Sequence, residues 1–368
     1  VLDTELSIPG ARARVAVITR PLNPTGLAFS IRRHRDKPWT LPLFIKNNMI
    51  SDLGAGLLSF FIDGARTLLI AGTRGSGKTS LIGSVLVEIM RKYRIIVVED
   101  TRELNTEFLA KLNYNIQPMK VRSALLKSGS EISADEGIRT SLRMGDSALI
   151  VGEVRSLEAL ALFEAMRTGA LANTVAGTIH GDSPYGVFDR IVNDLQVPRT
   201  SFKATDIIVV ANPVRSADGL HKFRRITQIT EVRKQWEEDP LKEGAFVDLM
   251  VYDSKSDSLL PTDELINGDS DIIKAIGGSI KEWAGNWTAI WDNIILRSKT
   301  KRTIVDYSIR YNIPDLLEAE SVIFMNDEFH RVMDIVREAS GALDSEKIFI
   351  EWEKRLKEHI ENAYGITI

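Results

Sequence analysis

The chain has 368 residues, of which 44% are hydrophobic, 26% charged and 7% aromatic, a composition typical of a folded globular protein with room for about two domains. It has no cysteine, which excludes disulfides, thiolate zinc sites, iron–sulfur clusters and cysteine catalysis, and no apolar run approaches the ~18 residues of a membrane-spanning helix. The net charge is −3, but residues 1–230 carry 30 Lys and Arg against 22 Asp and Glu, whereas residues 231–368 carry 17 against 28. The basic excess of the first part is too small to predict nucleic-acid binding.

The predicted elements begin with two antiparallel strands within residues 11–33. Apolar and basic residues alternate there on either side of a turn with Pro and Gly at 21–26. A single hairpin is too small to be stable alone. We therefore expect residues 1–38 to be the C-terminal part of an N-terminal domain that continues upstream, and residues 39–50 to be a linker to a helix that ends near Gly64.

Apolar segments then alternate with helical patterns as far as residue 232. Continuous apolar segments of this kind predict parallel strands covered by helices on both faces, so we expect residues 51–235 to form an α/β domain. The predicted strands cover residues 67–71, 95–99, 148–153, 174–180, 207–212 and 223–232, and the predicted helices include 81–90 and 157–167.

Composition changes near residue 235, because five of the six tryptophans and the acidic excess lie beyond it. We place a domain boundary there and expect residues 236–368 to form a C-terminal extension, with a strand pair at 246–252 and 258–261 followed by helices. Apolar residues recur at spacings of three and four between Asp271 and Leu296, which predicts one apolar helical face. They are Ile276, Ile280, Trp283, Trp287, Trp291 and Ile294. This face is interpreted as the core of a helical bundle, with a partner-binding surface as the alternative.

Residues Gly72 to Thr79 match the pattern G-x-x-x-x-G-K-[ST] between a predicted strand and a predicted helix, the context of a phosphate-binding loop. In such a loop backbone N–H groups surround phosphate oxygens, Lys78 contacts the terminal phosphates and the Thr79 hydroxyl binds Mg²⁺. The predicted nucleotide-binding residues are Gly72, Thr73, Arg74, Gly75, Ser76, Gly77, Lys78, Thr79 and Ser80. The motif predicts binding of ATP and Mg²⁺, but kinases, switches, transporters and motors all contain it.

Polar residues follow two further predicted strands at the edge where parallel sheets bind ligands. Glu153 ends the strand at 148–153, and we expect it to bind Mg²⁺ together with Thr79. His180 ends the strand at 174–180. A structural role of this histidine stays open as the alternative to a catalytic one.

A third acidic group follows the strand at 95–99. Glu99 and Asp100 end this strand, and both a functional role and a solvated position at the strand end are compatible with the sequence. Glu103 lies further along the loop, where its carboxylate is a candidate general base for an attacking water.

These four segments, in this order, resemble the secretion ATPases of the type II and type IV superfamily, which includes motors of type IV pili, conjugation and archaeal flagella. The resemblance covers about residues 11–235 and rests on the phosphate loop, on EDTRE (99–103), on LIVGEVR (149–155) and on TIH (178–180). The form EDTREL looks most like the archaeal branch. The resemblance implies a RecA-like P-loop core that hydrolyses ATP. It also implies that Glu103 is the general base, that Glu153 organises Mg²⁺ and its water, and that His180 senses the γ-phosphate.

Members of this family have an N-terminal domain whose last strands supply arginines to the nucleotide. By resemblance Arg14 and Arg32 are the matching residues, and solvent-facing positions on the hairpin are the alternative. Arg155 and Arg190 are further candidates. Relatives often have a Pro-acidic pair before the strand at 148–153, whereas this chain has Leu-Arg-Met-Gly-Asp-Ser at 142–147, which leaves the geometry of that loop open.

The resemblance further implies a homohexameric ring with nucleotide at subunit boundaries, which powers assembly of a type IV pilus or archaeal flagellum, or type II/IV secretion. The expected partner is an integral-membrane platform protein, and the expected location is cytoplasmic, at the inner face of the membrane. A conjugation-type ATPase or nucleic-acid translocase is the first alternative, although the acidic extension disfavours nucleic acid. A nucleotide switch without turnover is the second. An ATP-binding-cassette transporter is disfavoured, because no LSGGQ-like segment occurs.

Overall fold

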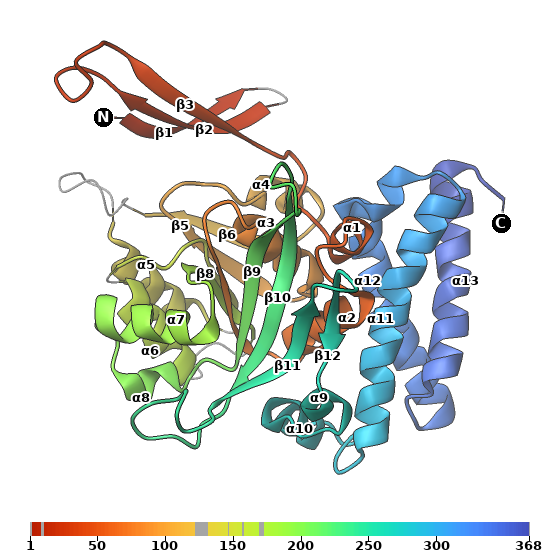
Figure 1. The fold of residues 1–368 in the computed structure, drawn as a ribbon. Coiled ribbons are helices and arrows are strands. Elements are labelled where there is room, and N and C mark those ends of the chain that lie inside the picture. Colours follow the sequence, from red (N-terminus) through yellow and green to blue (C-terminus); the bar gives the residue numbers. More distant parts are fainter. Residues whose placement is uncertain are drawn as a thin grey trace.

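The structure is a computed structural model that describes residues 2–8, 11–121, 132–145, 147–156, 158–168 and 173–367. The described residues contain a nine-stranded sheet in the order β12-β11-β10-β9-β4-β8-β7-β5-β6 (Figure 1). The strands from β9 to β6 in this order are parallel, and β10, β11 and β12 continue the sheet in antiparallel pairing. Their bounds are β4 (Thr67–Gly72), β5 (Arg94–Glu99), β6 (Asn115–Lys120), β7 (Ser147–Val151), β8 (Val175–His180), β9 (Ile207–Arg215), β10 (Lys222–Val232), β11 (Phe246–Asp253) and β12 (Ser258–Pro261).

Both faces of this sheet are buried. Along β4, Leu68 and Ile70 belong to one hydrophobic cluster and Leu69 and Ala71 to another, because successive side chains of a strand point to opposite faces. Burial on both sides explains the continuous apolar segments in the sequence. The predicted α/β class with a parallel-rich central sheet and a mainly helical C-terminal region is confirmed.

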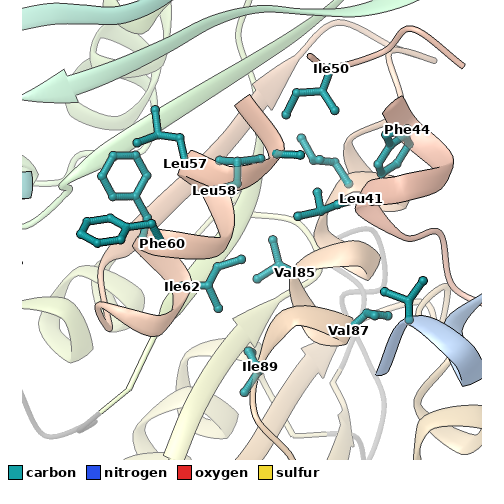
Figure 2. Close-up of a cluster of buried hydrophobic side chains, with 14 of the residues drawn as sticks. Leu41, Phe44, Ile50, Leu57, Leu58, Phe60, Ile62, Val85, Val87 and Ile89 are labelled. Atoms are coloured by element: carbon teal, nitrogen blue, oxygen red, sulfur yellow. The ribbon is translucent and has the colours of Figure 1, made fainter. Parts of the chain in front are cut away.

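Helices α1 to α4 and α9 to α13 contribute to the first cluster, and helices α5 to α8 to the second. Side chains from α1, α2 and α3 meet in the first cluster (Figure 2). The helix bounds are α1 (Leu41–Lys46), α2 (Asp52–Asp63), α3 (Lys78–Glu88), α4 (Thr106–Lys111), α5 (Ala134–Ser141), α6 (Glu158–Thr168), α7 (Pro184–Asp189), α8 (Arg199–Phe202), α9 (Asp263–Ile266), α10 (Asp271–Gly278), α11 (Trp287–Arg310), α12 (Ala319–Ser340) and α13 (Ser345–Tyr364), with short 3₁₀ helices η1 (Leu142–Met144) and η3 (Pro314–Leu317) and a π-helical turn η2 (Arg190–Asp194).

A separate antiparallel sheet precedes the core, in the order β1 (Leu2–Ile8), β2 (Ala11–Ile18) and β3 (Ala28–His34). The predicted strands within 11–33 are confirmed as β2 and β3. Neither β1 nor β6 of the large sheet is predicted from the sequence. β6 is a mostly exposed edge strand that contains Pro118, and within sheets proline is found mainly on edge strands.

The apolar helical face predicted between Asp271 and Leu296 is divided between two helices, because the chain forms α10 and α11 with a turn between them. Gly285 has φ +72°, a left-handed conformation, and the Asn286 side chain then accepts the backbone N–H of Ala289 to begin α11. Trp283 nevertheless is buried, with its ring 5.7 Å from that of Phe60. The interpretation of this face as core is therefore confirmed, since Ile276 and Ile294 are buried in the same cluster and Ile280, Trp287 and Trp291 pack against it.

The C-terminal helices share the first cluster with the core. A Cβ on Gly56 of α2 would lie 2.6 Å from the backbone nitrogen of Ser298 of α11, so the two helices approach at a residue without a side chain. The boundary predicted near residue 235 falls between β10 and β11, which are paired in one sheet. No helix within the described ranges combines the length and apolar character that crossing a membrane requires.

Buried ion pairs also connect the C-terminal helices to the core. The Lys301 ammonium on α11 lies 2.7 Å from the carboxylate of Glu88, the last residue of α3, and it also donates to Asn326 of α12. Arg297 on α11 pairs with Asp63 at the end of α2. Helix α3, which follows the phosphate loop, is thus fixed to α11 at its C-terminal end.

We expect Lys301→Met to lower the free energy of unfolding by about 3–5 kcal/mol, because it leaves the Glu88 carboxylate buried without its cation. Urea denaturation followed by circular dichroism measures this change. The matched control is Arg302→Met, which removes an exposed ion pair with Asp306 on the same helix and costs less than about 1 kcal/mol. Equal losses in the two variants would contradict the buried pair.

Candidate functional site

A cleft of about 540 Å³ lies between the three-stranded sheet and the carboxyl edge of the large sheet, a size that suits a nucleotide. Figure 1 shows the three-stranded sheet above this edge. The residues that line the cleft are Arg14, Ala16, Ser30, Arg32, Arg74, Gly75, Gly77, Lys78, Thr79, Ser80, Glu103, Glu153, Arg155, Thr178, His180 and Arg190. Most of the predicted site residues therefore meet in one place, whereas Gly72, Thr73 and Ser76 of the loop lie outside this lining.

The loop between β4 and α3 has the geometry of a phosphate cradle. Gly75 and Gly77 have φ of +78° and +99°, conformations that favour glycine, and a Cβ on Gly72 would lie 2.2 Å from the Ala211 carbonyl oxygen. Nζ of Lys78 donates to the carbonyl oxygens of Gly72 (2.8 Å) and Thr73 (2.9 Å). Gly77, Lys78, Thr79 and Ser80 at the N-terminus of α3 line the cleft, and the first N–H groups of a helix, which have no intrahelical partner, suit an anion.

A residue outside the predicted set supports this loop from β10. Nε of Arg224 donates to the carbonyl oxygen of Gly75 at 2.9 Å. The sequence carries no signal for this contact, because only the pairing of β9 with β10 brings Arg224 to the loop.

Glu153 follows β7 and lies at the centre of a polar group. Its Oε1 is 3.0 Å from Nε2 of His180, and its other oxygen pairs with Arg155, which also reaches the Asp100 carboxylate at 3.4 Å. Burial lowers the pKa of His180, and the nearby Lys78 ammonium lowers it further, which favours the neutral ring. The parallel strands β7 and β8 therefore bring the predicted carboxylate and histidine together.

Glu103 lies in the loop after β5 and faces the arginines of the small sheet. Its Oε1 is 3.4 Å from Nη1 of Arg14 and 3.9 Å from Nη1 of Arg32. Arg14 and Arg32 are register partners on β2 and β3, so they share the face of the sheet that covers the cleft. The Arg14 side chain is 23% exposed and is not solvent-facing, whereas the Arg32 side chain is still 62% exposed.

Glu99 is buried, so its interpretation as a solvated carboxylate is wrong. Its Oε1 accepts the backbone N–H groups of Glu103 and Leu104, each at 3.0 Å. A Cβ on Gly152 would lie 2.9 Å from Cγ of Glu99, so glycine before Glu153 makes room for this side chain. Glu99 thus fixes the backbone that carries Glu103, a role that only the folded loop reveals.

The cleft is strongly cationic. Six of its lining residues are arginine or lysine, whereas Glu103 and Glu153 supply two carboxylates. Arg190 starts the π-helical turn and pairs with Asp194 at 3.7 Å. The unusual segment before β7 forms η1, and Asp146 within it lies outside the described residues. The six cationic side chains of the cleft suit a polyphosphate, and a carboxylate beside them can polarise a water molecule.

Comparison with known proteins points to one family. The family model described as "Type II/IV secretion system protein" matches residues 3–239. The conjugal transfer protein TrbB of Rhizobium radiobacter is 26% identical over 194 residues, which are 52% of this chain and 55% of TrbB. The type IV secretion system protein PtlH of Bordetella pertussis is 27% identical over 188 residues, 44% of this chain and 53% of PtlH. The chain spans about half the length of these relatives.

Among solved structures, that of the Legionella pneumophila ATPase DotB is similar with a TM-score of 0.48 and 15% sequence identity. The similarity covers 83% of this chain and 77% of DotB.

The buried position of Glu99 makes stability depend on pH. Burial raises the pKa of Glu99 to about 7 from an ordinary value of 4.5, so the folded chain keeps a proton that the unfolded chain releases. The contribution of this proton to the free energy of unfolding is complete below pH 4.5 and is lost as the pH rises to about 7. Relative to Glu99→Gln, the wild-type chain should therefore lose on the order of 3 kcal/mol of unfolding free energy over this range.

Urea unfolding of both chains at a series of pH values measures this difference. Glu107→Gln is the matched control on the neighbouring α4, since a hydrogen bond from Arg102 lowers the pKa of Glu107 and the difference then has the opposite sign. A constant difference between wild type and Glu99→Gln across pH would be inconsistent with a buried carboxyl group.

Proposed function

Because the chain belongs to the family of type II/IV secretion system proteins, we propose that it is an ATPase that acts as a ring-shaped motor. The observation that carries this proposal is the cleft that Lys78, Glu103 and Glu153 of the core line together with Arg14 and Arg32 of the small sheet. A phosphate cradle, a candidate base and arginines from a separate sheet are the parts that phosphoryl transfer to water requires.

In the proposed reaction, backbone amides of the loop and Lys78 hold the β- and γ-phosphates of ATP. Glu103 accepts a proton from a water whose oxygen attacks the γ-phosphorus in line, while the bond from this phosphorus to the bridging oxygen breaks and ADP leaves. Arg14 and Arg32 stabilise the charge on the transferring group. The rate then depends on the position of the small sheet, since it carries both arginines.

Two further residues complete the proposed site. Arg155 orients the Glu153 carboxylate, and His180 contacts the γ-phosphate from the end of β8. Thr79 and Glu153 would hold Mg²⁺, which supplies charge neutralisation when bound, because a hydroxyl and a carboxylate beside phosphate oxygens are its usual ligands.

The machine that we propose for this motor assembles a type IV pilus or archaeal flagellum, or performs type II/IV secretion. The family description and the name of the PtlH relative support a secretion-type machine. We further propose a homohexamer that works in the cytoplasm against an integral-membrane platform protein at the inner face of the membrane.

A conjugation-type ATPase that moves nucleic acid is the second candidate, favoured by the name of the TrbB relative. DNA binding with a steep salt dependence would support it, since neutralised phosphates release counterions. The excess of acidic residues in 231–368 favours the first candidate.

We expect Glu103→Gln to lower kcat for ATP hydrolysis by about 10²- to 10⁴-fold with nucleotide binding retained, because the amide accepts no proton. Steady-state phosphate release and binding of a fluorescent ATP analogue measure the two quantities. The control Glu107→Gln changes an exposed carboxylate a few residues along the chain and should leave kcat unchanged. Full turnover in Glu103→Gln would exclude this residue as the base.

Arg32→Ala is expected to lower kcat by about 10³-fold, since an arginine on the transferring group contributes at least this much. Arg33→Ala is the matched control, because Arg33 pairs with Ala13 on the opposite face of the sheet. Mixing Arg32→Ala subunits with Glu103→Gln subunits tests the arrangement, because both residues line one cleft of one chain. The mixture should recover no activity, and recovery would show that the arginine acts on a neighbouring subunit's nucleotide.

A further inference from the structure

We propose that the C-terminal helical region controls ATP turnover by holding the linker between the small sheet and the core, with Glu318 and Glu320 as the positioning residues. This inference rests on the proposed ATPase function. It assigns a role to a part of the chain that lies beyond the family match at residues 3–239.

Residues 35–40 are the covalent connection between β3 and α1. Arg14 and Arg32 precede this linker in the sequence, and the phosphate loop follows it. Any shift of the arginines relative to Lys78 therefore changes the path of this linker. Contacts that hold the linker accordingly set the position of the arginines.

Residues 317–320, at and just before the start of α12, contact this linker at three points, and we call these contacts the grip. Arg35 forms an ion pair with Glu318, and Nζ of Lys37 lies 2.7 Å from Oε1 of Glu320. The buried hydroxyl of Thr40 donates to the carbonyl oxygen of Leu317 at 2.6 Å. Three residues of the segment 317–320 thus contact three of the six linker residues.

The opposite side of the linker contacts the loop that carries the candidate base. Nδ2 of Asn105, two residues after Glu103, donates to the carbonyl oxygens of Arg35 (2.8 Å) and Asp36 (2.9 Å). The guanidinium of Arg35 also donates to the carbonyl oxygens of Lys37 and Pro38. The linker is therefore held between the Glu103 loop and the start of α12.

Contacts with the linker can position the small sheet only if the C-terminal helices that make them are themselves fixed to the core. The C-terminal helices meet this condition, because α11 packs on α2 and Lys301 pairs with Glu88 at the end of α3. The two ion pairs to the linker are more accessible, since the Arg35, Lys37 and Glu320 side chains are each 35–41% exposed and Glu318 is 15% exposed. Exposed ion pairs are weak and screened by salt, so they can open while the C-terminal helices stay fixed to the core.

The closed grip keeps Arg14 and Arg32 within 3.4 Å and 3.9 Å of Glu103, at the cleft where the γ-phosphate would be transferred. Opening it lets the sheet move away while the phosphate loop is unchanged. Loss of the grip should therefore reduce kcat and leave the KM for ATP nearly unaltered.

The test uses the full chain with Glu318→Gln and Glu320→Gln combined. Because the chain has no cysteine, Thr25→Cys in the turn between β2 and β3 and Lys274→Cys on α10 introduce a unique pair of spin-label sites. We expect the distance distribution between the labels to broaden in the double variant and kcat to fall about 5-fold or more. Asp334→Asn, which breaks an exposed ion pair elsewhere on α12, is the matched control and should change neither quantity.

Charge reversal separates the grip from a general effect on folding. Lys37→Glu alone should broaden the distances and lower kcat, and Lys37→Glu with Glu320→Lys should restore both. Wild-type distances and wild-type kcat in the double glutamine variant would overturn the proposal. Absence of ATP hydrolysis by the wild-type chain would instead overturn the proposed function, and the label distances would still decide whether the C-terminal region holds the sheet.

Discussion

The parallel pairing of β4, β5, β7 and β8 is the constraint on which the site depends. Parallel strands place all their carboxyl ends at one edge of the sheet. The phosphate loop, Glu103, Glu153 and His180 follow these four strands, so residues far apart in the sequence meet in one cleft. Burial of both sheet faces keeps this edge rigid, because helices cover the strands on either side.

The charged residues at this edge are held in place by buried residues that do not themselves face the cleft. Glu99 is an example, since its carboxyl leaves water and is compensated by two backbone N–H groups of the loop it organises. The missing side chain of Gly152 provides the space that Glu99 fills. The position of a candidate base therefore depends on a carboxyl group that does not itself face the cleft.

The two parts that flank the core differ in how they are attached. The C-terminal helices continue the hydrophobic cluster of α2 and α3 and add buried ion pairs, so they form one body with the phosphate-loop helix. The small sheet instead meets the core through polar contacts, such as that of Arg14 with Glu103. The C-terminal region is thus fixed to the core, whereas the polar interface between the small sheet and the core can adjust. This difference is why we propose that the C-terminal region controls the position of Arg14 and Arg32.

The sequence by itself determined the α/β class and the phosphate loop, because apolar periodicity and glycine spacing are local properties. Glu103, Arg14 and Arg32 were singled out by the resemblance of their segments to a family, not by these local patterns. The sequence did not determine β1 and β6, whose pairing depends on a neighbouring strand, nor the break between α10 and α11. Only the tertiary structure decided which face of the small sheet carries Arg14 and Arg32 to Glu103, that Glu99 is buried, and that Arg224 reaches the phosphate loop. These are contacts between segments distant in sequence, and their geometry arises from strand order and packing, which no local pattern encodes.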